Sequence, residues 1–71
     1  MEPEYTIMIN GTVTEYNDTR AGYNMKLRTV LDTLKAAKAW AIVRAYADDE
    51  PIFAARVIGG NTQPHPLEGS E

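Results

Sequence analysis

The side chains best suited to chemistry in this chain are one histidine and one run of three acids. His65 stands between two prolines, where no regular element would orient it as a general base. Residues 48–50 read Asp-Asp-Glu, and acids at successive turn positions are typical of a solvated hairpin tip rather than of a cation site. We therefore expect no catalytic residue, no metal site and no enzyme activity.

Sequence motifs for cofactors are missing as well. The chain contains no Gly-x-Gly-x-x-Gly pattern and no phosphate-binding loop, and no helical pattern follows its one adjacent glycine pair, Gly59-Gly60. A structural zinc site needs several Cys or His ligands, whereas this chain has no Cys and one His. The sequence therefore predicts a protein without a cofactor.

The formal charge of −3 combines a basic middle segment with two acidic flanks. Residues 20–47 hold six of the seven Lys and Arg but only one of the ten Asp and Glu. Phosphate backbones attract proteins with a net positive face, and the acidic flanks work against such a face here. Nucleic-acid binding is therefore only a second alternative for the function.

The short length of the chain favours association. Below roughly 70–80 residues, a hydrophobic core rarely supplies more than about 3–5 kcal/mol, and this 71-residue chain has no Cys for a disulfide. We therefore expect the chain to gain the missing stability by forming a homodimer or higher homo-oligomer. The sequence shows neither a signal-peptide pattern nor an apolar run of membrane-spanning length, so we expect a cytoplasmic protein without membrane contact.

A β-hairpin is predicted over residues 5–16. Two β-favouring runs flank Asn10-Gly11, the dipeptide that best tolerates the positive φ angles of a type I′ turn. One long strand with a bulge at Gly11 remains an alternative, because apolar residues on both sides of it would then share one face. The hairpin register pairs Ile9 with Thr12, Met8 with Val13 and Tyr5 with Tyr16.

An amphipathic helix is predicted over residues 25–39, with Asn24 as its N-cap. Apolar side chains recur at helical spacing and form one stripe, which we expect to pack on the sheet. The stripe consists of Leu27, Val30, Leu31, Leu34 and Ala37.

Two apolar runs, residues 40–47 and 52–58, predict a second hairpin with a turn at residues 48–51. Pairing Ala47 with Ile52 would give this hairpin two apolar faces. One face is rich in small residues, and we expect the helix to cover it; the reverse arrangement remains an alternative. The small-residue face holds Ala41, Val43, Ala45, Ala47, Ile52, Ala54 and Ile58 with Arg56, and the aromatic face holds Trp40, Ile42, Tyr46, Phe53, Ala55 and Val57 with Arg44.

The aromatic face would have no element of the chain to cover it. Contiguous exposed apolar patches mark interaction surfaces, and Trp, Tyr and Arg are enriched in binding hot spots. The basic outer side of the helix would add charged contacts. The predicted binding residues are therefore Trp40, Arg44, Tyr46 and Phe53 as anchors, with Arg28, Lys35 and Lys38 as charged contacts.

These features predict an α+β fold of ββαββ type, with one helix on a small antiparallel sheet; βαββ with one long first strand is the alternative. Residues 1–58 would form a single domain and residues 59–71, with two Pro and three Gly, a flexible C-terminal tail.

The predicted function is that of a small non-enzymatic interaction protein that binds, and inhibits or modulates, a protein partner. By analogy, the short acidic chain resembles the small accessory and inhibitor proteins of phages and mobile elements. A first alternative is an oligomeric protein that holds a planar or anionic small ligand between its subunits.

Overall fold

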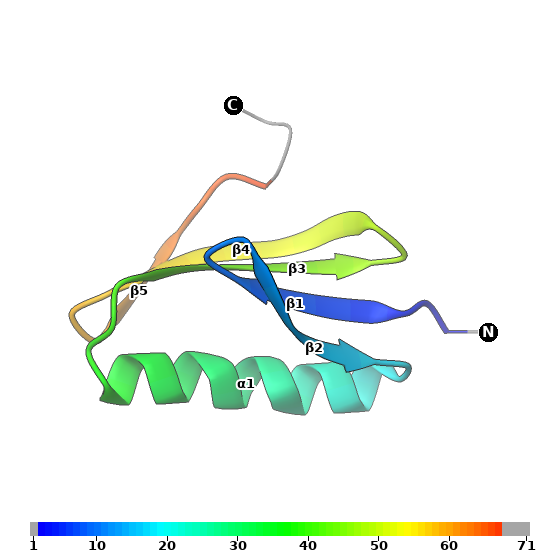
Figure 1. Cartoon of the computed structure of the whole chain (residues 1–71), viewed down its shortest axis with the longest axis horizontal. Coiled ribbons are helices and arrows are strands. Elements are labelled where there is room, and N and C mark those ends of the chain that lie inside the picture. Colours follow the sequence, from blue (N-terminus) through cyan, green and yellow to red (C-terminus); the bar gives the residue numbers. More distant parts are fainter. Residues whose placement is uncertain (1, 68–71) are drawn as a thin grey trace.

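The structure is a computed structural model and describes residues 2–67 of the chain. Five strands form one antiparallel sheet in the order β2-β1-β3-β4-β5, and a single helix lies along one of its faces (Figure 1). This α+β arrangement confirms the predicted fold class and adds a fifth strand to it. The elements are β1 (Tyr5–Ile9), β2 (Thr12–Asn17), α1 (Arg20–Ala36), β3 (Ala41–Ala47), β4 (Glu50–Ile58) and β5 (Asn61–Pro64).

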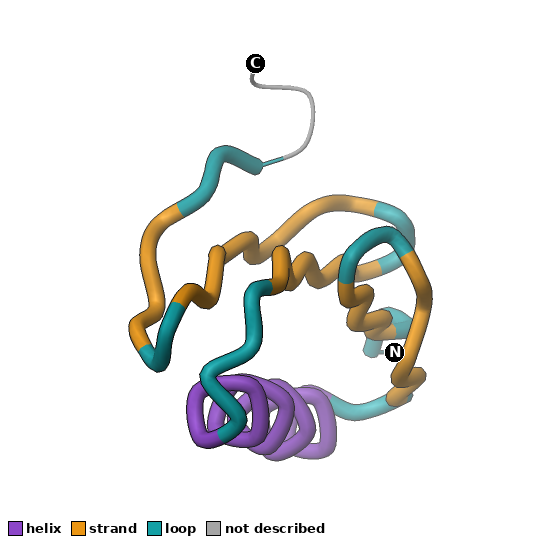
Figure 2. Tube along the Cα trace, turned by 60° about the vertical axis from the view of Figure 1, so that its left-hand side comes forward, coloured by secondary structure: helices purple, strands orange, loops and turns teal. Residues whose placement is uncertain are grey.

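The sheet curves around the helix, so that its concave face encloses α1 (Figure 2). Within residues 2–67 the opposite face carries no helix, and residues 65–67, which follow β5, rise away from the sheet on that side (Figure 1). We call this helix-free face of the sheet the open face.

The first hairpin forms at the predicted turn. Asn10 and Gly11 take positive φ angles of 51° and 84°, as a type I′ turn requires. Next to the turn, Met8 lies opposite Val13 as expected. The alternative of one long strand is wrong, because β1 and β2 are separate neighbouring strands.

A bulge changes the register further from this turn. The pairing shifts between Ile7 and Met8, so Tyr5 lies opposite Asn17 instead of Tyr16. The extra residue in β2 reverses the alternation of its side chains relative to β1. Sequence alternation in so short a strand gave no sign of this bulge.

The helix begins five residues before the predicted start. Thr19, not Asn24, is the N-cap, and its hydroxyl accepts a hydrogen bond of 3.1 Å from the Gly22 backbone N–H. The helix ends at Ala36 rather than at residue 39, and Lys38 follows it with a positive φ of 53°. The earlier start brings Tyr23 into the helix, where its side chain is buried.

The core lies between α1 and the concave face of the sheet. Tyr23 stacks on Tyr5 of β1 with ring centroids 4.8 Å apart, and the Arg20 guanidinium lies within 6 Å of both centroids, at 5.8 and 5.6 Å. The predicted stripe packs against this cluster as expected, except for the exposed Ala37. Core contacts of the helix come from Leu27, Val30, Leu31 and Leu34.

The second hairpin has a tighter turn than predicted. Asp48 and Asp49 form a two-residue turn with φ angles of 48° and 67°, and Ala47 pairs with Glu50 instead of Ile52. A second bulge, between Ala45 and Tyr46, sets the register for the rest of β4.

A one-residue register change exposes the opposite face of β4. The expectation that the helix covers the alanine side of β3 is confirmed, since Ala41, Val43 and Ala45 are buried beneath it. The predicted faces of β4 are wrong: alternate residues from Phe53 onward pair with these β3 residues. The helix side of β4 holds Phe53, Ala55 and Val57, and the open face holds Ala54, Arg56 and Ile58.

Part of the predicted C-terminal tail is ordered structure. Gly59 and Gly60, with φ angles of 58° and 91°, turn the chain back so that β5 pairs with β4. Residues 61–64 therefore belong to the sheet, and residues 68–71 of the predicted tail lie outside the described residues.

Candidate functional site

The strand registers arrange the open face in rows that cross the sheet. One row runs from Val13 on β2 through Met8 on β1 and Arg44 on β3 to Ala54 on β4. A neighbouring row places Arg56 on β4 between Ile42 and Gln63. Both arginines thus project from adjacent strands on the same face, offset by two residues along β4.

His65 completes a basic cluster at one side of this face. It follows the last residue of β5, Pro64, which pairs with Ala55, so the continued register puts His65 beside Ala54. The methyl side chain of Ala54 leaves room above β4 for Arg44 to reach across it. Arg44 Nη2 and His65 Nε2 lie 3.2 Å apart.

The hydrogen bond between these two residues fixes the tautomer of the imidazole. Every nitrogen of a guanidinium is a donor, so Arg44 Nη2 donates and His65 Nε2 accepts. The imidazole proton of the neutral ring then resides on Nδ1. His65 presents Nδ1–H as a donor on the other side of its ring.

Three buried nitrogen donors of the cluster have no hydrogen-bond partner within residues 2–67. They are Arg44 Nη1, Arg56 Nε and His65 Nδ1. A buried donor without an acceptor costs about 1–3 kcal/mol, so groups of this kind in a native protein call for an acceptor. No carboxylate of residues 2–67 forms an ion pair with either arginine. The cluster therefore combines two positive charges with three N–H groups that have no acceptor in the described part of the chain.

The other half of the open face is less polar and hollowed. A shallow pocket of about 300 Å³ lies over β1, β2 and β3. Its apolar wall includes Val13, whose side chain is 37% exposed. The pocket is lined by Thr6, Met8, Val13, Tyr46 and Asp49.

Only part of the predicted binding set comes together. Arg44 and Tyr46 lie on the open face as expected, but Phe53 packs into the core beneath the helix because the bulge between Ala45 and Tyr46 shifts β4 by one residue. Trp40 precedes β3, and its side chain is 62% exposed. The predicted aromatic anchors therefore do not form one patch.

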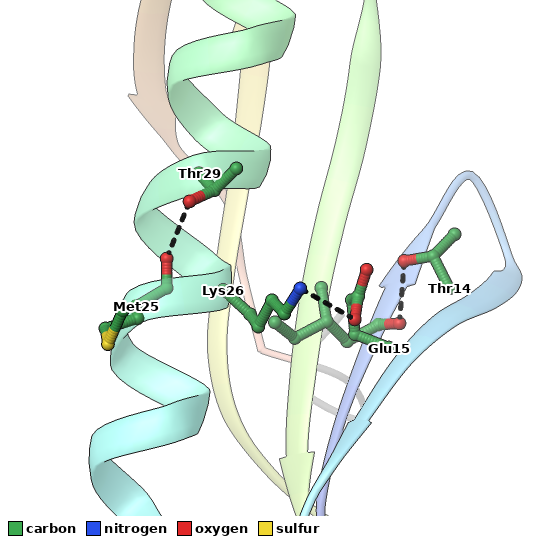
Figure 3. Close-up of polar contacts among 6 residues, drawn as sticks. Thr14, Glu15, Met25, Lys26 and Thr29 are labelled. Atoms are coloured by element: carbon green, nitrogen blue, oxygen red, sulfur yellow. Dashed lines mark hydrogen bonds and ion pairs between the residues drawn. The ribbon is translucent and has the colours of Figure 1, made fainter.

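The predicted cations of the helix lie away from this face. Arg28 and Lys35 are exposed on α1, and Lys38 is exposed in the link to β3. A helix cation that was not in the predicted set, Lys26, lies 4.0 Å from the Glu15 carboxylate of β2 and ties the helix to the edge of the sheet (Figure 3). None of the three predicted charged contacts thus lies on a strand of the open face, where Arg44 and Tyr46 are found.

Arg56 and His65 are the binding candidates that sequence reasoning missed. The predicted register put Arg56 on the helix side, and His65 was assigned to a tail without structure. The available signal was the run Arg56-Val57-Ile58-Gly59-Gly60 before a short polar segment, since a glycine pair can close a hairpin and bring the next residues back to pair with the preceding strand.

Within the run of acids at residues 48–50, Asp48 has a structural role. Asp48 Oδ1 accepts a hydrogen bond of 2.9 Å from the Glu4 backbone N–H, and the Asp48 N–H donates to the Glu4 carbonyl oxygen.

Within residues 2–67 no group of three His, Cys, Asp or Glu side chains is placed to hold a metal ion. The part of the chain that the structure describes also contains no helix that is both long and apolar enough to cross a bilayer.

Comparisons with known proteins give no match: no family model, no curated protein and no solved structure is similar to this chain at a significant level.

Proposed function

We propose that this chain is a small non-enzymatic binding protein that docks a protein partner on the open face of its sheet. The observation that carries the proposal is the pocket over β1, β2 and β3, on a face that no helix of the described residues covers. A sheet face in contact with water usually carries polar side chains, whereas Met8, Ile42, Tyr46 and Ile58 are half-buried apolar or aromatic residues on this one.

The charge of this face favours a partner of opposite sign. In a two-fold homodimer, the same patch of both subunits meets itself. A face-to-face pair of this chain whose two-fold axis passes near Arg44 and Arg56 would bring these cations of the two copies together, and like charges at an interface are unfavourable. We therefore propose a different protein as the occupant, one that presents apolar side chains to the pocket and carries a net negative charge on the surface that faces the open face.

Site-specific photo-crosslinking tests where the partner binds. Benzoylphenylalanine replaces Val13 at the pocket in one variant and Met25 on the outer side of α1 in the other, and both full-length proteins are exposed to lysate of the source cells. The two positions make a matched pair, because their native side chains are both exposed, at 37% and 71%. We expect one crosslinked protein from position 13 and none from position 25.

The crosslinked protein is then purified and its affinity measured by titration calorimetry. Val13→Lys should weaken binding at least tenfold and Met25→Lys should not change it, because only the first inserts a charge at the pocket. Crosslinking from both positions alike, or equal affinities of the two variants, would overturn the proposal.

A further inference from the structure

We propose that Arg44, Arg56 and His65 form a binding site for a small tetrahedral oxyanion, of the phosphate class. This goes beyond the proposed function, because such an anion can bind whether or not a protein docks on the pocket half of the face. The site lies over β3, β4 and the first residue after β5.

The number and charge of the three donor groups indicate what kind of acceptor would satisfy them. Arg44 Nη1, Arg56 Nε and His65 Nδ1 come from three segments, are all buried and all need an acceptor. A single water molecule has two lone pairs and no charge, so it would leave one donor and both cations uncompensated. An oxyanion with several oxygens and a double negative charge matches three donors and two guanidinium groups.

The enclosure of these atoms favours a small free ion over a group on a docked protein. Each of the three nitrogens is shielded from solvent, so a flat protein surface resting on the open face does not reach them. His65 lies beyond the last strand pair of β5, so its ring can shift without breaking any pairing of the sheet. The ion would enter as the His65 side chain moves away from Arg44 Nη2, and it would then accept from a ring N–H of His65 as well as from Arg44 and Arg56.

Titration of the full-length protein with inorganic phosphate, followed by ¹⁵N NMR at low ionic strength, tests the site. The Nε–H signal of Arg56 reports directly on one of the three donors. We expect this signal to move downfield and to saturate with a dissociation constant below 1 mM, on the order expected for a few charge-assisted hydrogen bonds. Sulfate should compete with phosphate, and acetate should bind at least tenfold more weakly.

Variants separate a defined site from general attraction to positive charge. Arg44→Gln and Arg56→Lys should each weaken phosphate binding at least tenfold, the second because it keeps the charge but removes Nε–H from its position. Lys26→Gln removes a cation that pairs with Glu15 on the edge of the sheet and should leave the affinity unchanged. Backbone amide spectra of each variant show whether it remains folded.

Failure of this inference can be told from failure of the proposed function. An Arg56 signal that does not saturate, or equal weakening by Lys26→Gln, would overturn the oxyanion site. Acetate binding as tightly as phosphate would also overturn it, since the cluster would then take a carboxylate. Each of these outcomes leaves the crosslinking result at Val13 to decide the docking proposal by itself.

Discussion

At the scale of single residues, Tyr23 links the helix to the sheet through its stack on Tyr5. Burial raises the pKa of Tyr23 above its usual 10.0, while the nearby Arg20 cation opposes the shift. In the unfolded chain the phenol loses its proton near pH 10, whereas the folded protein retains it to higher pH. The unfolded state then binds fewer protons, so stability is complete below pH 10 and falls as the pH rises through the folded pKa.

Tyr23→Phe should therefore flatten the alkaline loss of stability. The phenyl ring keeps the stack and the burial but cannot ionise. Urea unfolding followed between pH 9 and pH 11 measures the slope of the free energy of unfolding against pH. A variant slope as steep as that of the native protein would mean that another group causes the loss.

Replacing the N-cap Thr19 and replacing Thr29 inside the helix should change the free energy of unfolding differently. Thr19→Ala removes the N-cap acceptor of Gly22 N–H and should lower the free energy of unfolding by about 0.5–2 kcal/mol. Thr29→Ala removes a hydroxyl that donates back to the Met25 carbonyl oxygen, at 3.0 Å (Figure 3). Because alanine favours helices and such back-bonding does not, this change should be neutral or stabilising. Equal losses in chemical denaturation would argue against Thr19 as the cap.

At the scale of elements, the β4 register decides which side chains reach each face. Phe53 packs against the core under the helix, and its neighbour Ala54 lies on the open face between Arg44 and His65. Phe53→Ala should cost about 3 kcal/mol, at the lower end for a core phenylalanine, and Ala54→Ser about 1 kcal/mol or less. Urea denaturation of both variants tests the register. A larger loss of stability from Ala54→Ser than from Phe53→Ala would mean that Ala54, not Phe53, lies under the helix, as the predicted four-residue turn would place it.

The elements also show what the sequence could predict. Asn10-Gly11 specified its turn, and the spacing from Leu27 to Leu34 specified the buried helix stripe, because both signals are local. The two bulges were not predictable, since each inserts one residue without changing the local composition. The strand 61–64 was missed for a similar reason: its residues are polar, and its order comes from pairing with β4.

The candidate site depended on these unpredictable features. Arg44 and Tyr46 were predicted on the exposed sheet face because β3 alternates regularly, and their placement holds. Phe53 and Arg56 exchanged faces with the one-residue change in β4. His65 was dismissed because its neighbours are prolines, yet β5 brings it within hydrogen-bonding distance of Arg44.

At the scale of the whole molecule, the small core and the open face raise the question of self-association. The homo-oligomer expected from the length of the chain stays a prediction. The like charges of Arg44 and Arg56 oppose self-association through this face, so the docking proposal predicts a monomer in low salt at a protein concentration of about 50 µM. Sedimentation equilibrium measures this mass. A dimer that Val13→Lys dissociates and Met25→Lys preserves would show that a second copy occupies the open face.

The central claim is that the open face of the sheet is the binding surface of this protein. Backbone amide shift mapping with the purified crosslinked partner tests it most directly. The account predicts that amide signals around the pocket, at Met8, Val13 and Tyr46, shift or broaden on addition of the partner, while those of Met25 and Arg28 on the outer side of α1 stay in place. Shifts confined to the helix, with the pocket signals unchanged, would contradict it.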